Sequence, residues 1–252
     1  MRTRTVALAT AAGAALLAPA SYPAAAQQPT AEPVVELPET RASSPAARAG
    51  SAAAPVREGS VRAADLLAAT RSCKQISHGR FRTDDGARAS VPVCGARGAV
   101  FWKADMDIDC DGQPTKACSR RTDPLFFHAT AFQQSDGRQL NAERLPYVVV
   151  PGPSRRWNHA EHGITGGTVA AVIHRGRVQY AVVGDTGPTD LIGEASYATA
   201  KALGIRPDPK SGGVGSGVTY VFFKGPKAKP IESHRAAVAR GDALARQFVR
   251  RN

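Results

Sequence analysis

Short segments of β-type sequence, separated by turn residues, are the feature that most restricts the fold of this chain. They are rich in β-branched and aromatic residues. The chain also has 24 Gly and 18 Pro, which favour turns over long helices. The segments span 99–110, 124–133, 145–151, 166–176, 178–185 and 217–225. Six strands can close a small barrel, so the sequence predicts a mainly β fold with a hairpin turn at Arg175-Gly176.

Helical patterns are few and lie around these strands. Residues 61–73 place Leu66 and Leu67 in a short helical segment. Residues 193–205 predict a helix that begins after Gly193 and ends at a glycine cap. Residues 231–251 place Val238, Leu244 and Phe248 on one side of a charged helix. We therefore expect peripheral helices, the last of which packs its apolar stripe on the barrel.

The N-terminus has the pattern of a secretory signal. Arg2 and Arg4 precede an uncharged apolar run over 6–18, and small residues at 24–26 predict cleavage before Gln27. The apolar run is too short for a membrane anchor, and no later segment has the roughly 20 apolar residues of a span. Residues 1–26 are thus expected to be a signal peptide, 27–64 an Ala/Pro-rich disordered linker and 65–252 the folded domain of a secreted, extracellular protein.

Export makes the cysteines informative. The chain has four, and an even number in an oxidising compartment indicates two disulfides. Four cysteines allow three pairings, and the short local loops favour Cys73–Cys94 and Cys110–Cys118. A zinc site is disfavoured because there is no CxxC spacing and no histidine at ligand spacing from a cysteine.

The strongly basic charge does not by itself indicate a nucleic-acid partner. The formal net charge is +12, and removal of Arg2 and Arg4 leaves +10 for the mature chain. The Arg and Lys residues are scattered, and no aromatic ladder accompanies them, which argues against nucleic-acid binding. Adhesion to anionic surfaces is a simpler explanation of the charge.

The segment 104–112 carries alternating aspartates. In a strand, successive side chains point to opposite faces. The apolar residues of the segment then face the core, and four carboxylates share the other face: Asp105, Asp107, Asp109 and Asp111. Such a face needs a compensating charge. We interpret it as a substrate-facing acidic strand.

Two alternatives remain for this acidic segment. Asp107, Asp109 and Asp111 resemble the start of an EF-hand calcium loop, but Cys118 occupies the place of the bidentate Glu and no helices flank the loop. The acids can also form a solvated face neutralised by Arg120 and Arg121.

Asp185 and Glu194 are the candidate reactive pair. Asp185 ends a buried strand, residues 186–188 form a tight loop, and Glu194 falls in the first turn of the predicted helix. Both carboxyl groups are thus expected at one end of the domain. Glycoside cleavage needs one protonated and one ionised carboxyl group. The helix dipole favours an ionised Glu194 as base and leaves Asp185 as acid, an order that can be reversed. The alternative is that both residues simply cap the turn and the helix.

Four blocks of sequence bring a resemblance. ADMDIDCDG, LPYVVVP, VGDTGPTDLIGEASYATAKALGI and GGVGSGVTYVFFKG resemble the fungal-type chitosanases of glycoside hydrolase family 75. The similarity runs in order from about Cys73 to the C-terminal helix. It implies a six-stranded barrel of double-psi type and endo-cleavage of β-1,4 links between glucosamine units with inversion. The two essential acids of the family fall on Asp185 and Glu194.

The resemblance also sets expectations for binding. The partner is chitosan, whose ammonium groups an acidic strand can pair with. Candidate substrate-binding residues are Asp105, Asp107, Asp109, Thr186 and Asp190. Inversion implies carboxyl groups roughly 6.5–9.5 Å apart with a water between them. No cofactor and no metal are required, and a monomer is expected.

Two other functions stay open at this point. A muramidase-like or transglycosylase-like enzyme would keep the acids and act on peptidoglycan. A non-catalytic, expansin-like glycan-binding module would bind without turnover, although it has no need of both Asp185 and Glu194. The WNHAEHG segment, with His159, Glu161 and His162, is not the HExxH motif of zinc proteases.

Overall fold

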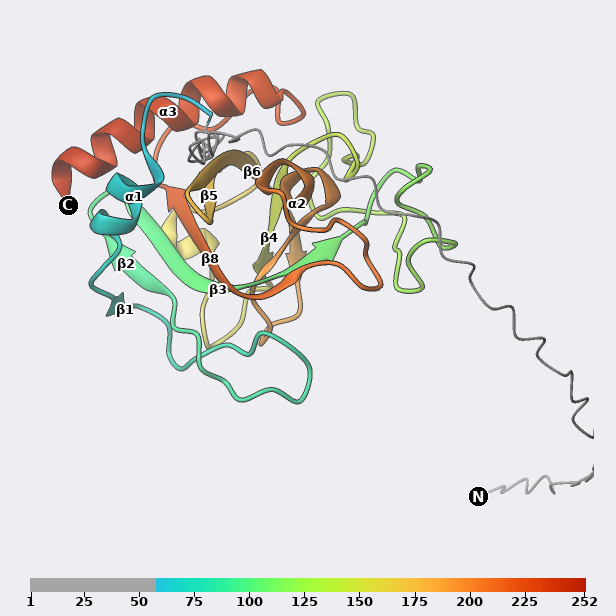
Figure 1. The fold of residues 1–252 in the computed structure, drawn as a ribbon, viewed down its shortest axis with the longest axis horizontal. Helices are drawn as coiled ribbons and strands as arrows, with labels where there is room; N and C mark the ends of the chain where they lie inside the picture. Colours follow the sequence, from blue (N-terminus) through green and yellow to red (C-terminus); the bar gives the residue numbers. More distant parts are fainter. Residues whose placement is uncertain (1–57) are drawn as a thin grey trace, which may run out of the picture. The chain divides into compact units, whose positions relative to one another are not determined.

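The computed structural model describes residues 58–252, and Figure 1 shows the arrangement of their elements. The predicted signal peptide, and the predicted linker up to residue 57, lie outside the described residues. Within the described part of the chain, no helix combines the length and the apolar character that a membrane span requires.

Six strands close into a barrel, as the sequence predicts. Around the ring they follow the order β3-β7-β4-β6-β5-β8, and β8 pairs back with β3. Their bounds are β3 Ala99–Asp109, β4 Tyr147–Pro151, β5 Val169–His174, β6 Arg177–Gly187, β7 Glu194–Ser196 and β8 Val214–Phe223. The pairs β3–β7 and β4–β6 are parallel, and the other barrel pairs are antiparallel. Two short strands, β1 Lys74–Gln75 and β2 Cys94–Ala96, extend the sheet from β3.

Five of the six predicted strands are present, and the prediction of the sixth is wrong. Residues 124–133 form a loop without a strand. The barrel takes its sixth strand from β7, a segment of three residues that the sequence placed inside a helix. The predicted hairpin turn is confirmed: β5 and β6 pair up to His174 and Arg177 around Arg175 and Gly176. Both turn residues have a positive φ, of 45° and 78°, which is the geometry of a tight two-residue β-hairpin turn.

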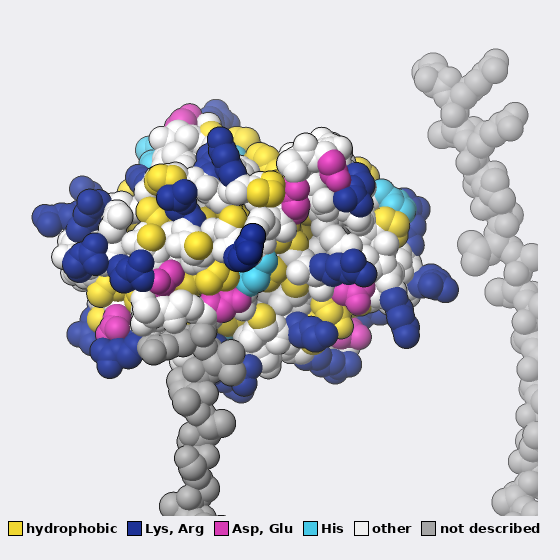
Figure 2. Space-filling view, turned by 90° about the horizontal axis from the view of Figure 1, so that it is seen from above, with side chains coloured by type: hydrophobic (Ala, Val, Ile, Leu, Met, Phe, Trp, Pro, Cys, Tyr) yellow, Lys and Arg dark blue, Asp and Glu magenta, His cyan; other side chains and the backbone are white. Residues whose placement is uncertain are grey.

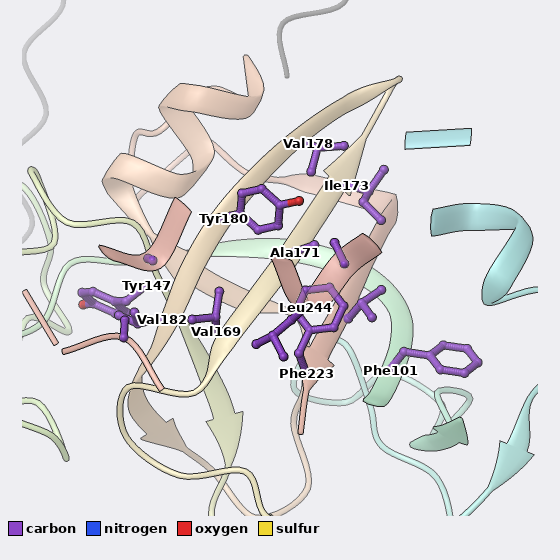
Figure 3. Packing of buried hydrophobic residues seen from close by; sticks show 14 of the residues in the cluster. Phe101, Tyr147, Val169, Ala171, Ile173, Val178, Tyr180, Val182, Phe223 and Leu244 are labelled. Carbon is purple, nitrogen blue, oxygen red and sulfur yellow. The ribbon is translucent and has the colours of Figure 1, made fainter. Parts of the chain in front are cut away.

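Alternation along the barrel strands produces two apolar layers. One cluster draws residues from all six barrel strands and includes Trp102, Val148 and Tyr220. The other draws from the opposite faces of several strands and from two helices, α1 Ala63–Ala69 and α3 His234–Arg251. Figure 3 shows part of this second cluster, whose members include Tyr180, Phe223 and Leu244. The helices therefore cover one side of a barrel that has its own core.

Helix α3 packs as the sequence predicts. Leu244 and Phe248 are buried, and Val238 packs against the same cluster. Gly241 lets the helix approach the barrel, because a Cβ at this position would lie 2.4 Å from the Tyr180 ring. Figure 1 shows α3 running over β5 and β6, with α1 beside its C-terminal half.

The described folded unit also includes residues before the predicted boundary at 65. The Ser60 amide donates to Asp242 Oδ1 (2.7 Å), and the backbone amide of Tyr180 donates to Glu58 Oε2 (2.9 Å). Val61 and Ala63 are buried. The end of the segment that the sequence assigned to the linker is therefore in contact with the barrel and α3.

The disulfides are the pairs that the short loops favoured, Cys73–Cys94 and Cys110–Cys118. The first ties the segment before β1 to β2. The second closes a loop directly after β3, at the end of the acidic segment. No free cysteine remains among the described residues.

Candidate active site

An acidic cleft of about 590 Å³ opens beside the ends of β3 and β7. Its lining includes seven carboxylates and a single lysine, Lys210; the carboxylates are those of Asp85, Asp107, Asp109, Asp111, Asp123, Glu194 and Asp208. Such a lining gives the cleft a local charge opposite to that of the whole chain. On the face that Figure 2 shows, Lys and Arg side chains lie scattered over the surface. The cleft therefore suits a cationic ligand despite the net positive charge.

A larger cavity, of about 880 Å³, lies between the 225–229 segment and α3. Its lining contains Lys227, Lys229 and Arg240 and no carboxylate. It offers no acid for chemistry and would repel a cation, so we place the candidate active site in the smaller acidic cleft.

The aspartates of β3 do not form the single open face that the alternation predicts. Asp107 and Asp109 line the cleft. Asp105 instead is only 2% exposed, and its Oδ1 packs against Gly193 without a hydrogen-bond partner within residues 58–252. Burial, reinforced by the charge of Asp107, raises the pKa of Asp105 to about 7. Gly193, which lines the cleft, packs directly against Asp105 Oδ1 and helps to keep this carboxyl group out of the cleft.

The acids divide into two groups. One oxygen each of Asp84, Asp105 and Asp107 lie within 4.8 Å of one another, and the same holds for Asp109, Asp111 and Asp185. Either group has the oxygen chemistry to bind a hard cation. Within residues 58–252 no ion pair joins Arg120 or Arg121 to these acids. The two arginines therefore do not neutralise the strand.

Glu194 lies on strand β7 and not in the first turn of a helix. Helix α2 spans Tyr197–Leu203, and Ser196 is its N-cap, accepting a hydrogen bond from the Thr199 amide (3.3 Å). The predicted C-terminal cap at Gly204 is confirmed, with φ of 73°. Because β7 pairs with β3, Glu194 faces Asp107 in parallel register. The helix dipole therefore does not favour its ionised form as the sequence suggested.

Electrostatics instead favour a protonated Glu194. Burial, followed by the charges of Asp107 and Asp185, raises its pKa to about 8. Its Oε2 also lies close to Gly187, the last residue of β6, where an added Cβ would be 3.3 Å away. Glu194 thus stands between β3 and the strand that carries Asp185.

Asp185 is a buried residue within β6, 7% exposed, and not at a free strand end. In the pairing of β4 with β6, Val148 and Val149 stand opposite Val183 and Asp185, so Gly184 is an extra residue. Such a bulge re-aims the side chain that follows it. Asp185 Oδ1 accepts hydrogen bonds from the amides of Ala131 (2.8 Å) and Thr186 (2.7 Å). Burial raises the pKa of Asp185, and these two amides oppose the rise.

Two other predicted contacts lie outside the cleft lining. Thr186 offers its backbone amide to Asp185. Asp190 is paired with the Arg82 guanidinium, and its carbonyl accepts from the Arg82 amide. Both residues support the β6–β7 connection.

Trp157 is buried and packs edge-on against Trp102.

Sequence reasoning missed several acids of the cleft. Asp85, Asp123 and Asp208 come from three separate loops and have no common spacing. It also missed the Ala131 amide, which lies in the segment predicted as a strand. Proline or glycine beside these aspartates marks turns, but only the fold brings the turns together.

Two carboxyl groups of raised pKa, on strands β6 and β7 that both pair with β4, meet the requirements of a glycoside hydrolase. Comparison with known proteins gives the family. Residues 106–248 match the family described as "Fungal chitosanase of glycosyl hydrolase group 75". The chain belongs to this family, glycosyl hydrolase group 75.

Named relatives are fungal. The chain is 30% identical over 176 residues to "Endo-chitosanase C" of Aspergillus oryzae, and the matched residues cover 66% of this chain and 43% of that protein. It is 30% identical over 161 residues to "Endo-chitosanase B" of Aspergillus oryzae (strain ATCC 42149 / RIB 40), covering 57% of this chain and 67% of the relative. It is also 32% identical over 142 residues to "Endo-chitosanase" of Aspergillus fumigatus, covering 51% and 59%. The chain thus spans less than half of Endo-chitosanase C.

Proposed function

We propose that this protein is a secreted endo-chitosanase that hydrolyses β-1,4 links between glucosamine units. The observation that carries the proposal is the acidic cleft with Glu194 in its lining and Asp185 buried behind it. Family membership and the names of the relatives support the same substrate. We further propose that the protein acts as a monomer, without a cofactor, a nucleic-acid partner or a stable membrane association.

The structure supports a particular division of roles within this proposal. Glu194, with a pKa raised to about 8, keeps its proton in mildly acidic solution and serves as the general acid that protonates the leaving oxygen. Asp185 accepts two backbone amides, which stabilise its carboxylate, and serves as the general base that activates water. This order is the reverse of the one suggested by the helix-dipole argument, because Glu194 begins a strand.

An inverting reaction follows from these roles. Glu194 Oε donates its proton to the glycosidic oxygen as the bond to the anomeric carbon breaks. Asp185 takes a proton from a water molecule, whose oxygen attacks the opposite face of the same carbon. The proton gained by Asp185 and that lost by Glu194 then exchange with solvent, which restores the starting state.

The cleft explains how a basic protein can hold a polycation. Asp107 is exposed and lies beside Glu194 in the lining, and we propose that it pairs with a sugar ammonium group. Asp109 also lines the cleft, but it is only 5% exposed and burial raises its pKa well above the ordinary value, so it is less suited to this contact than the sequence suggested. Long-range repulsion from the remaining charge slows the encounter. Added salt screens this repulsion beyond about 10 Å, so moderate salt should help the encounter more than it weakens the short contacts.

The test is the release of reducing ends from soluble chitosan at mildly acidic pH. The parent is compared with Asp185→Asn and Glu194→Gln, whose folding is checked by circular dichroism. We expect activity in the parent and a loss of at least about 10³-fold in each variant, since each removes one partner of the acid–base pair. Release from peptidoglycan but not from chitosan would favour a muramidase-like enzyme. Chitosan binding without turnover in the parent would favour a binding module.

A further inference from the structure

Two large apolar side chains stand in solvent at the rim of the acidic cleft. Leu125 is 89% exposed and Phe127 is 61% exposed. Among the described residues only one other large apolar side chain is exposed, that of Leu67 on α1, and its exposed fraction is much lower, at 37%. Leu125 lines the cleft. Phe127 lies outside the lining, but its backbone amide donates to Asp111, which is a lining residue. The exposure is thus concentrated beside the proposed chemistry.

The loop that presents these side chains is fixed by the acids of the cleft. The Leu125 amide donates to Asp123 Oδ1 (2.9 Å), and the Phe127 amide donates to Asp111 Oδ1 (2.7 Å). The Phe127 carbonyl accepts from the Gly112 amide (2.9 Å). Phe126, between the two, is buried in the second apolar cluster, the one that also includes residues of α1 and α3. The exposed positions are therefore held in place by their neighbours.

A rigid apolar rim beside carboxylates matches the chemistry of a glucosamine unit. The faces of a pyranose ring carry C–H groups, which pack well on apolar and aromatic side chains. The amino group of the same sugar is a cation below neutral pH and is matched by Asp111 and Asp123, which flank the rim. Exposed apolar groups bordered by polar residues mark ligand-binding grooves. A ligand with one apolar face and one cationic edge fits both parts of this surface.

We propose that Leu125 and Phe127 form a platform on which one sugar ring of the chitosan chain packs. The proposal rests on the proposed function and extends the binding surface beyond the acids. The platform binds the substrate and takes no part in proton transfer. Its loss should therefore weaken binding of the polymer and leave the chemical step largely intact.

The test compares Phe127→Ala, Leu125→Ser and their double variant with the parent on soluble chitosan. The double variant is expected to raise KM about 5- to 20-fold, the usual effect of removing a main contact, and to change kcat less than about twofold. Because the contact is apolar, the ratio of KM values should persist at high salt, where the effect of an acidic variant shrinks. Phe127→Trp keeps an aromatic ring at this position, so its KM should be closer to the parent value than that of Phe127→Ala. Leu67→Ser is the matched control and should leave KM and kcat unchanged.

The outcomes separate this inference from the proposed function. An active parent whose KM is unaltered within about twofold in the double variant overturns the platform and leaves the chitosanase proposal standing. If the parent has no activity, its binding to chitosan beads is measured instead. Retention of the parent on the beads, with loss of retention in the double variant, supports the platform. Equal retention of both proteins, or retention of neither, overturns it. Melting temperatures of all variants should match the parent, because both side chains are exposed.

Discussion

Asp107 and Glu194 are register partners in the parallel pairing of β3 with β7, so two carboxyl groups from distant parts of the chain share one edge of the cleft. Among the neighbouring charges, that of Asp107 makes the largest contribution to the raised pKa of Glu194. The proposed acid is thus set by its position in a sheet and not by a helix end.

This pairing predicts a change in the pH profile. In the parent, kcat/KM should fall as the pH rises past about 8, where Glu194 loses its proton. Asp107→Asn removes a nearby negative charge, which lowers the pKa of Glu194 and moves this alkaline limb to lower pH. The profile should be recorded on a soluble chitosan oligomer with kcat and KM measured separately, so that an effect of Asp107 on substrate binding can be distinguished from the shift of the alkaline limb. An alkaline limb that stays in place in Asp107→Asn would contradict the assignment.

Stability should depend on Glu194 with a definite sign. Its folded pKa of about 8 is above its ordinary value of 4.5, so between these values the folded state binds more protons than the unfolded state. The free energy of unfolding then decreases as the pH rises through this range. Glu194→Gln removes the effect. It should stabilise the protein by about 4 kcal/mol at pH 8 and very little at pH 4.5, as measured by urea unfolding.

Gly193 should tolerate no side chain. Its φ is 113°, and a Cβ there would lie 1.9 Å from Asp105 Oδ1. Gly193→Ala should therefore lower the free energy of unfolding by about 2–4 kcal/mol and reduce activity by displacing Glu194. Gly137→Ala is the control, because Gly137 also has a positive φ but open space around it. Equal losses in the two variants would show that backbone strain alone is responsible and that the contact with Asp105 is unimportant.

Metal removal should leave the reaction unchanged. The two groups of three carboxylates can accept a cation, yet the proposed roles of Asp185 and Glu194 need none. We expect kcat/KM to be the same after dialysis against EDTA and after addition of Ca²⁺. Loss of activity in EDTA with recovery in Ca²⁺ would mean that one of the two carboxylate groups is a functional metal site. Comparison of the Asp84→Asn and Asp111→Asn variants would then show which group binds the metal.

The long, regular patterns of the sequence predicted most of the fold. Alternating or continuous apolar runs identified β3, β4, β5, β6 and β8, and the spacing of Leu244 and Phe248 identified α3. Residues 124–133 have the same composition, but several of their backbone amides donate to the side chains of Asp111, Asp123 and Asp185. Gln133 forms only an isolated bridge with Gln139, so no strand develops. Strand β7 is too short to show any period, so its pairing partners alone decide its structure.

The identity of the two proposed acids was accessible from sequence, and their environments were not. The local structure around both differs from the sequence prediction, because Asp185 lies within β6 and not at its end, and Glu194 begins β7 and not a helix. Their proton affinities depend on burial and on acids that arrive from other parts of the chain, such as Asp107 and Asp123. The covering of Asp105 by Gly193 likewise depends on a contact between segments that are distant in sequence.

The strand that carries Glu194 is also the strand that completes the ring between β3 and β4. Closure of the barrel consequently brings Glu194 to its place beside Asp107, and a chain with an open ring cannot hold the two proposed acids together. Catalytic competence should then vanish in the same cooperative transition as the β-sheet signal when denaturant is added, and an open-ring intermediate, if one is populated, should be catalytically silent.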